Sequence, residues 1–231
     1  MTEDRPRVAV VVFPGSNDDR DAALALESLG ADPVLHWHAD SELPDVGAVV
    51  LPGGFSYGDY LRAGAIARFS PAMRAVADFA AEGGFVLGIC NGFQVLCEAR
   101  LLPGALRPNE SLSFVCEDVP LRVERAEPPF LTSCEVGQRL TIPIKHGEGC
   151  YFADADLLAE LDRAGQIVLR YEDNPNGSRD DVAGVISREG NVMGLMPHPE
   201  HAVDPLLGSA DGALILRALV EKARERLLAP A

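Results

Sequence analysis

One cysteine, Cys90, stands where a nucleophile is expected in an α/β enzyme. It lies in the sequence GICNG at 88–92, between an apolar run at 85–89 and a stretch with helical spacing that continues to Leu96. This is the strand–turn–helix pattern of a nucleophile elbow, with cysteine in place of serine. The positive end of the following helix favours the thiolate, and the backbone N–H of Asn91 would face a developing oxyanion. The alternative is a buried cysteine with a purely structural role in an ordinary turn.

A base for this cysteine is available far along the chain, in the sequence MPHPE at 196–200. Pro199 keeps His198 out of the α region, so we expect an extended segment in which His198 and Glu200 project to the same side. A carboxylate at that place fixes the imidazole tautomer and supports the imidazolium that forms when the ring takes the thiol proton. We therefore predict a catalytic triad of Cys90, His198 and Glu200.

Two alternative roles are open to the same histidine. It could be a surface or core residue without chemistry, but that role does not account for two prolines and an acid beside it. It could also bind a metal together with Glu200 and His201, because the two histidines are three residues apart. We expect no metal, since the prolines disfavour a helix there and no pair of cysteines supplies further ligands.

A pair of glycines could supply a second oxyanion donor. Gly53 and Gly54 follow the apolar run AVVL at 48–51, which has the character of a buried strand. Glycines at the carboxyl end of a parallel strand let backbone amides come close to a ligand, and ligands bind at that end of an open sheet. We predict an oxyanion hole made by the amides of Gly54 and Asn91. A plain loop is the alternative.

The elements that must position these residues alternate between buried strands and amphipathic helices. Apolar runs at 8–13, 48–51 and 85–89 are typical of parallel strands, and a further strand is expected near 34–37. Helices are expected near 18–29, 73–79 and 91–96. Segments at 114–123 and 140–144 alternate partly and indicate antiparallel additions at a sheet edge. The fold class is therefore α/β, with an open, mostly parallel, doubly wound sheet and antiparallel edge additions, in a single domain over residues 1–231.

Composition excludes several classes of function. The formal net charge is −15, and both nucleic acids and anionic membranes need basic clusters, so we expect neither as a partner. No apolar run approaches the roughly 20 residues that a membrane span requires. The five cysteines form no regular framework, which favours free thiols in a cytoplasmic protein.

Taken together, these residues resemble a known family. The sequences PGG at 52–54, GICNG at 88–92 and HPE at 198–200 are similar to those of the class I, triad-type glutamine amidotransferases. Further motifs resemble the branch formed by the glutaminase subunits of phosphoribosylformylglycinamidine synthase. These motifs are FPGSN at 13–17, GGFSYGDYLRAG at 53–64, NGFQ at 91–94, N-x-S-x-x-F at 109–114, HGEG at 146–149 and NPNGS at 174–178. His201 departs from the pattern, because that position commonly carries arginine in the family.

The resemblance implies a reaction and its partners. Glutamine would be hydrolysed through a thioester on Cys90, and the ammonia would pass to a large synthetase subunit of de novo purine synthesis, assisted by a small helper subunit. This chain would bind no cofactor, while the synthetase would use ATP and Mg²⁺; accordingly, the sequence contains no Walker-type phosphate-binding loop. The resemblance places Gly53 and Phe55 near glutamine. The residues that it places near glutamine or the subunit interface are Gln94, Asn109, Phe114, His146, Gly147 and Glu148.

Two competing functions are compatible with the same fold. A cysteine peptidase or a deglycase-like enzyme could share the elbow, although such proteins generally lack a His-Pro-Glu segment after a late strand. A non-catalytic binding or regulatory protein could keep the fold, but the intact Cys90, His198 and Glu200 disfavour it.

Overall fold

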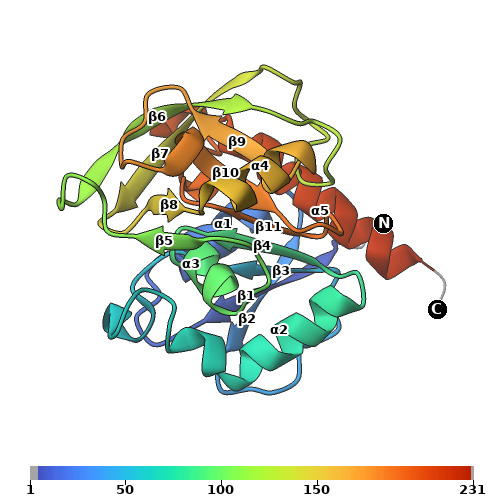
Figure 1. The fold of residues 1–231 in the computed structure, drawn as a ribbon. Helices are drawn as coiled ribbons and strands as arrows, with labels where there is room; N and C mark the ends of the chain where they lie inside the picture. Colours follow the sequence, from blue (N-terminus) through green and yellow to red (C-terminus); the bar gives the residue numbers. More distant parts are fainter. Residues whose placement is uncertain (1–4, 230–231) are drawn as a thin grey trace.

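The fold is built on one large sheet that runs through the whole molecule (Figure 1). The computed structural model describes residues 5–229, so the predicted domain bounds, 1 and 231, lie outside the described part. Within that part the sheet has nine strands in the order β2-β1-β3-β4-β11-β10-β9-β6-β7. Their bounds are β1 (Arg7–Val12), β2 (Asp32–Trp37), β3 (Ala48–Leu51), β4 (Phe85–Ile89), β6 (Val115–Val123), β7 (Arg139–His146), β9 (Ile167–Tyr171), β10 (Val182–Ile186) and β11 (Val192–Leu195).

The first half of the sheet is parallel. Strand β1 pairs with β2 and β3, β3 pairs with β4, and β4 pairs with β11, all in parallel register. Every residue of β3 and β11 is buried, as the continuous apolar runs in the sequence predict. A parallel strand is covered on both faces by helices, which explains why no polar alternation is present.

The second half of the sheet is antiparallel. Strands β10, β9, β6 and β7 continue outward from β11, each antiparallel to its neighbour, so β6 and β7 form the predicted edge additions. Buried and partly exposed side chains alternate along β7, which is typical of a strand with one face toward solvent. Two short strands, β5 (Ala105–Arg107) and β8 (Cys150–Phe152), pair separately beside the sheet.

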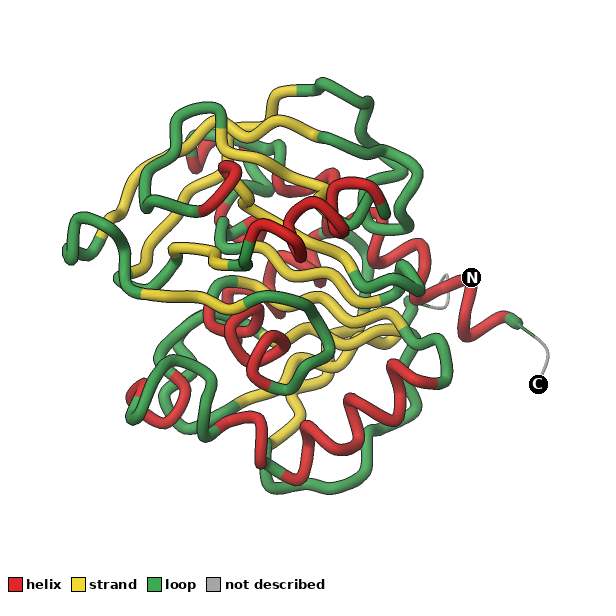
Figure 2. Tube along the Cα trace, viewed as in Figure 1, coloured by secondary structure: helices red, strands yellow, loops and turns green. Residues whose placement is uncertain are grey.

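Helices cover both faces of the parallel half, which makes the sheet doubly wound (Figures 1 and 2). Helices α1 (Asp19–Ser28) and α5 (Gly212–Leu228) pack on one face, and α2 (Pro71–Ala81) and α3 (Asn91–Glu98) pack on the other. Helix α4 (Ala155–Arg163) lies on the antiparallel half. Over residues 5–229, no helix has both the length and the apolar character needed to span a membrane. The 3-10 turns are η1 (Ser56–Asp59), η2 (Ala67–Phe69), η3 (Arg179–Asp181), η4 (Pro199–His201) and η5 (Pro205–Leu207).

This topology brings four chain segments to one edge of the sheet. The carboxyl ends of parallel strands meet at the same edge, so the residues that follow β1, β3, β4 and β11 gather there. The chain leaves β1 in one direction to reach β2 and returns on the other side to form β3. That change of direction opens a crevice at the strand ends, where ligands bind in open α/β sheets.

Candidate active site

Cys90 sits in a strained turn between β4 and α3. Its backbone has φ 49° and ψ −104°, a conformation that costs energy for any residue with a side chain and that clusters at functional sites. The flanking residues Gly88 and Gly92 do not have a positive φ, so glycine is needed there for space rather than for backbone freedom. A Cβ at Gly92 would lie 2.0 Å from the Leu51 carbonyl oxygen, and one at Gly88 would lie 2.5 Å from a Leu96 methyl group. The glycines therefore let α3 pack tightly against β3 and β4.

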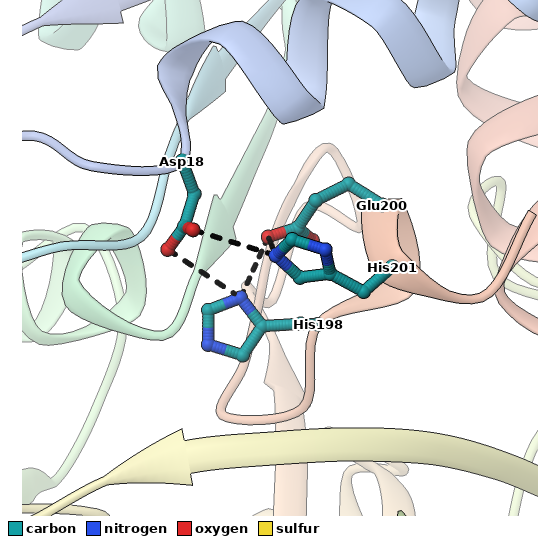
Figure 3. Close-up of side chains that lie close together, drawn as sticks. All are labelled: Asp18, His198, Glu200 and His201. Carbon is teal, nitrogen blue, oxygen red and sulfur yellow. Dashed lines mark hydrogen bonds and ion pairs between the residues drawn. The ribbon is translucent and has the colours of Figure 1, made fainter. Parts of the chain in front are cut away.

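His198 and Glu200 form a buried pair (Figure 3). His198 Nδ1 lies 2.6 Å from Glu200 Oε1, and both side chains are almost completely inaccessible to solvent. The expected extended segment is wrong beyond His198: residues Pro199–His201 form the 3-10 turn η4, and His198 itself has φ −106° and ψ 87°. The turn places the carboxylate beside the imidazole even more directly, because it folds Glu200 back over the ring. The imidazole Nδ1–H donates to the carboxylate, which leaves Nε2 free to accept a proton.

Cys90 and His198 are neighbours because β4 and β11 are paired strands. Ile89 pairs with Leu195, and the Cys90 amide donates to the Leu195 carbonyl oxygen at 2.8 Å. His198 Nε2 is buried and has no hydrogen-bond partner within residues 5–229. Burial by itself disfavours the imidazolium, but the negative charges of Glu200 and of the Cys90 sulfur outweigh it and raise the pKa of His198 to about 10. The arrangement favours the imidazolium form of His198.

A small cavity opens beside the sulfur. Its volume is about 210 Å³, below the roughly 300–1,000 Å³ of sites that bind drug-sized ligands, so it suits a molecule of amino-acid size. Most of the residues predicted at the site line it, namely Gly54, Phe55, Cys90, Gln94, Phe114, His146, Gly147 and Glu148. Asn17, Asp18, Asp59 and Lys145 complete the wall, while Gly53 and Asn109 do not line the cavity.

The Asn91 side chain joins the two loops that carry the predicted oxyanion donors. Its Oδ1 accepts from the Ser56 amide at 3.1 Å, and its Nδ2 donates to Gln94 at 2.8 Å and to Asp59 at 3.2 Å. The Asn91 N–H is the first amide of α3, and first-turn amides have no partner inside a helix. The Gly54 N–H likewise makes no hydrogen bond within the described residues. Both amides are therefore available to a ligand.

Asn109 supports the cavity wall from behind. Its Oδ1 accepts from the Gly149 amide at 2.9 Å and from His146 Nδ1 at 3.1 Å, and its Nδ2 donates to the His146 carbonyl oxygen at 2.8 Å. On the other side, Asn176 Nδ2 lies 3.4 Å from His146 Nε2. His146 is thus a neutral imidazole that donates through Nδ1 and accepts through Nε2. This network holds the loop 146–149 against the cavity.

The electrostatics of His146 give a testable dependence of stability on pH. Burial and the positive charge of His198 lower the pKa of His146 to about 4, whereas an unfolded histidine titrates near 6.5. Between these values the unfolded state binds more protons, so stability falls as the pH falls through this window. We expect a loss of about 3 kcal/mol in the free energy of unfolding between pH 7 and pH 4 from this group.

The matched variant for this measurement is His146→Gln, which can donate to Asn109 and accept from Asn176 without titrating. Urea unfolding of both proteins at pH 7 and pH 4.5 gives the difference that His146 makes. Asp59, whose pKa burial and Glu148 raise to about 6, titrates in the same window with the opposite sign, but it is common to both proteins. Equal pH dependence in the two proteins would contradict the assignment.

The possible metal ligands named from the sequence, His198, Glu200 and His201, do lie together, and Asp18 joins them. Asp18, His198, Glu200 and His201 place their ligand atoms within 4.8 Å of one another (Figure 3). However, the Lys145 ammonium donates to Asp18 and lies 2.9 Å from His201 Nε2, and His198 already donates to Glu200. A fixed positive charge inside the cluster opposes cation binding, so the geometry is that of an ion-pair network.

Sequence reasoning missed three residues that the structure places at the site. Asp18 stands where an acid usually stabilises the first turn of a helix, but its carboxylate makes no bond to α1 and points toward His198 and His201. Lys145 reaches the site from the antiparallel strand β7, and Asp59 comes from the glycine-rich loop. Asp18 could have been identified by one signal: it follows β1 at the carboxyl edge of a parallel sheet.

Fold and site together define an α/β protein that presents a cysteine elbow beside a buried histidine–carboxylate pair. Residues 5–211 match the family described as the CobB/CobQ-like glutamine amidotransferase domain. The chain belongs to this glutamine amidotransferase family and, within it, to the PurQ subunits of phosphoribosylformylglycinamidine synthase. The sequence resemblance is thereby confirmed.

The similarity to these relatives extends over nearly the full length of both chains. A phosphoribosylformylglycinamidine synthase subunit PurQ from Rubrobacter xylanophilus is 61% identical, over 94% of this chain and 99% of the relative. The corresponding subunit from Salinibacter ruber is 55% identical, over 93% and 95%. A solved structure of PurLQS from Thermotoga maritima contains a chain that is 45% identical, with a TM-score of 0.87 over 94% of this chain and 98% of that one.

Proposed function

We propose that this chain is a glutaminase, a single catalytic domain that hydrolyses glutamine to glutamate and ammonia. The observation that carries the proposal is that Cys90 lines a cavity of amino-acid size and lies next to the buried His198–Glu200 pair. Because the chain belongs to a glutamine amidotransferase family, a carboxamide is supported as the substrate.

In the proposed reaction the Cys90 thiolate attacks the side-chain amide carbon of glutamine. The amides of Gly54 and Asn91 would stabilise the tetrahedral oxyanion, and His198 would donate its proton to the departing nitrogen. Ammonia leaves and a γ-glutamyl thioester remains. His198 then accepts a proton from water, which cleaves the thioester to glutamate and restores the sulfur. Glu200 holds the imidazole orientation in both steps.

Glutamine recognition is assigned to the side chains that line the cavity. Gln94, whose Nε2 donates to the Glu148 carbonyl oxygen at 2.7 Å, would fix the loop against which the substrate lies. Asp59 and Glu148 add negative charge that suits the substrate ammonium group, and burial and Glu148 raise the pKa of Asp59 to about 6. Phe55 and Phe114 would cover the aliphatic part. Gly53 and Asn109 act behind the wall rather than at the substrate.

We propose that the ammonia passes to a synthetase partner that carries the ATP and Mg²⁺ chemistry, together with a small third subunit. The solved Thermotoga relative is a chain in a structure described as PurLQS. Large apolar side chains stand exposed next to the cavity-lining Asp59 and Phe114, and they suit a surface that a partner covers. They are Tyr60, Leu61 and Leu112, of which Leu61 is 90% exposed. The five cysteines are all free, which supports the predicted cytoplasmic location.

A glutamine analogue with a diazo-ketone in place of the amide tests the proposal directly. We expect stoichiometric modification of Cys90, located by peptide mass spectrometry, with the other four thiols unmodified. Addition of the synthetase and small subunits should accelerate glutamate release, because docking completes the site. Equal labelling of all thiols would favour a non-catalytic binding protein. Labelling without glutamate release in the assembled complex would favour another cysteine enzyme.

A further inference from the structure

The carboxylate of Asp18 is buried in an unusual place for a residue at the start of a helix. Asp18 precedes α1 in the N-cap position, where an aspartate normally accepts from an amide of its own first turn. Its side chain makes no such bond, and the residue is only 3% exposed. A buried carboxylate is costly unless it is paired, so its partners must account for its position.

Two side chains from distant parts of the chain pair with it. The Lys145 ammonium, from β7, donates to Asp18 Oδ1, and His201 Nε2 lies 3.4 Å from the same oxygen. Lys145 Nζ also lies 2.9 Å from His201 Nε2, so Asp18, Lys145 and His201 form one network. Burial raises the pKa of the Asp18 carboxyl, but His201 and Lys145 outweigh burial and hold this pKa well below its usual range. Asp18 therefore carries a full negative charge.

The second oxygen of Asp18 faces the imidazole of His198 (Figure 3). Asp18 Oδ2 lies 3.8 Å from His198 Nδ1, the same nitrogen that lies 2.6 Å from Glu200. Gly53 makes this approach possible, since a Cβ there would lie 2.5 Å from Asp18 Oδ2 and 2.7 Å from His198 Cε1. Two carboxylates thus face one edge of the ring.

The charged and titratable groups around His198 come from several elements. The ring of His201 lies 5.5 Å away between centroids, and Cys90, Asp18 and Glu200 surround the imidazole. Lys145 and His146 approach from β7. The two carboxylates favour the imidazolium, whereas Lys145 offsets the charge of Asp18 and reduces its effect.

We propose that Asp18, balanced by Lys145, is a positioning residue that sets how firmly His198 holds the proton taken from Cys90. Asp18 lines the cavity, but the proposed effect on the proton acts through the imidazole of His198, which Asp18 Oδ2 faces at 3.8 Å. The role of Asp18 in catalysis rests on the proposed glutaminase function. The effect of its charge on the proton affinity of His198 does not depend on glutamine. The chain uses Lys145, far along the sequence, to adjust the strength of a base at the end of β11.

The test is the pH dependence of Cys90 alkylation by iodoacetamide, followed at the Cys90 peptide by mass spectrometry. The alkaline limb of this profile reports the loss of the imidazolium proton. Asp18→Asn removes a negative charge near the ring and should move the limb to lower pH by about one unit. Lys145→Met leaves Asp18 uncompensated and should move the limb to higher pH. A merely structural role would not give shifts of opposite sign.

Two further variants keep the result interpretable if a variant is destabilised. Lys145→Arg retains the charge and should leave the limb at its wild-type position. Asp21→Asn removes a carboxylate from the same helix that lies 3.9 Å from His201 and does not face His198, so it should leave the limb unchanged. Urea unfolding identifies any variant that fails to fold. If either Asp18→Asn or Lys145→Met fails to fold, the direction in which the other variant moves the limb relative to wild type decides the test.

Shifts in the same direction for Asp18→Asn and Lys145→Met, or no shift in either, would overturn the proposal. A parallel glutaminase assay separates this failure from failure of the proposed function. If the two variants move the limb in opposite directions but wild type releases no glutamate, the charge effect is supported and the glutaminase function is rejected. If wild type releases glutamate but the limb does not move in opposite directions, the glutaminase function is supported and the charge effect is rejected.

Discussion

Replacing Cys90 with alanine is expected to abolish glutamate release from glutamine, with kcat reduced by about 10⁴-fold or more. The reason is that every bond-making step of the proposed reaction passes through the sulfur, so that only oxyanion stabilisation and binding would remain. The cavity wall loses the sulfur atom and its contact with the Lys145 carbonyl oxygen at 3.9 Å, and the other hydrogen bonds of the wall remain, so glutamine should still bind. Glutamate formation in the assembled complex measures the first effect, and isothermal titration with glutamine measures the second.

The matched control is Cys97→Ala, seven residues further along and also buried. Burial strongly raises the pKa of the Cys97 thiol, which keeps it protonated, and Cys97 does not line the cavity. We expect this variant to keep its activity and to lose about 1 kcal/mol of stability from the small cavity created. Undiminished glutamate release by Cys90→Ala would reject the mechanism, whatever the control shows.

Replacing Gly15 with alanine should reduce kcat by about 10²- to 10³-fold, the range found when one oxyanion donor is removed. Gly15 follows β1 and has φ 91°, and its carbonyl oxygen accepts from the Phe55 amide at 2.9 Å. A Cβ at Gly15 would lie 2.3 Å from the Phe55 carbonyl oxygen. The loop must move to relieve this clash, and the adjacent amide of Gly54 moves with it.

Gly30→Ala provides a control with the same backbone strain. Gly30 has φ 90°, almost identical to Gly15, but a Cβ there has no neighbour within 4 Å. Both variants pay the cost of a left-handed conformation, about 1 kcal/mol, so only the contact with Phe55 distinguishes them. We expect Gly30→Ala to keep its kcat and to unfold at slightly lower urea concentration. Equal kcat values in the two variants would show that the Gly15 contact does not position an oxyanion donor.

The parallel half of the fold is predictable from local sequence. The run at 85–89 coincides with β4, and 48–51 coincides with β3, because strands buried on both faces must be apolar throughout. Helix α2 begins at Pro71 and ends before Gly83, as the proline and glycine signals indicate. These boundaries depend on backbone chemistry within a few residues, which is why they can be seen without the tertiary structure.

The supporting parts of the site are less accessible to sequence reasoning. The HPE pattern predicts an extended segment, yet it forms a 3-10 turn, since Pro199 restrains only the residue before it and can itself begin a helical turn. The motif around Asn109 predicts a substrate contact, but Asn109 faces His146 and Gly149 behind the cavity. In both cases the sequence motif identifies an important residue but does not indicate which neighbouring residue its side chain contacts.

By itself, the sequence determined the alternation of strands and helices up to the elbow, the elbow cysteine, and the histidine and carboxylate that pair with each other two residues apart. These features follow from local backbone preferences and from combinations of residue types that a purely structural role rarely requires. Only the tertiary structure decided that Asp18 turns away from its own helix, because the charge that attracts it is Lys145, 127 residues further along the chain. Electrostatic pairing depends on distance in space, and that distance is set by how β7 packs beside the parallel sheet.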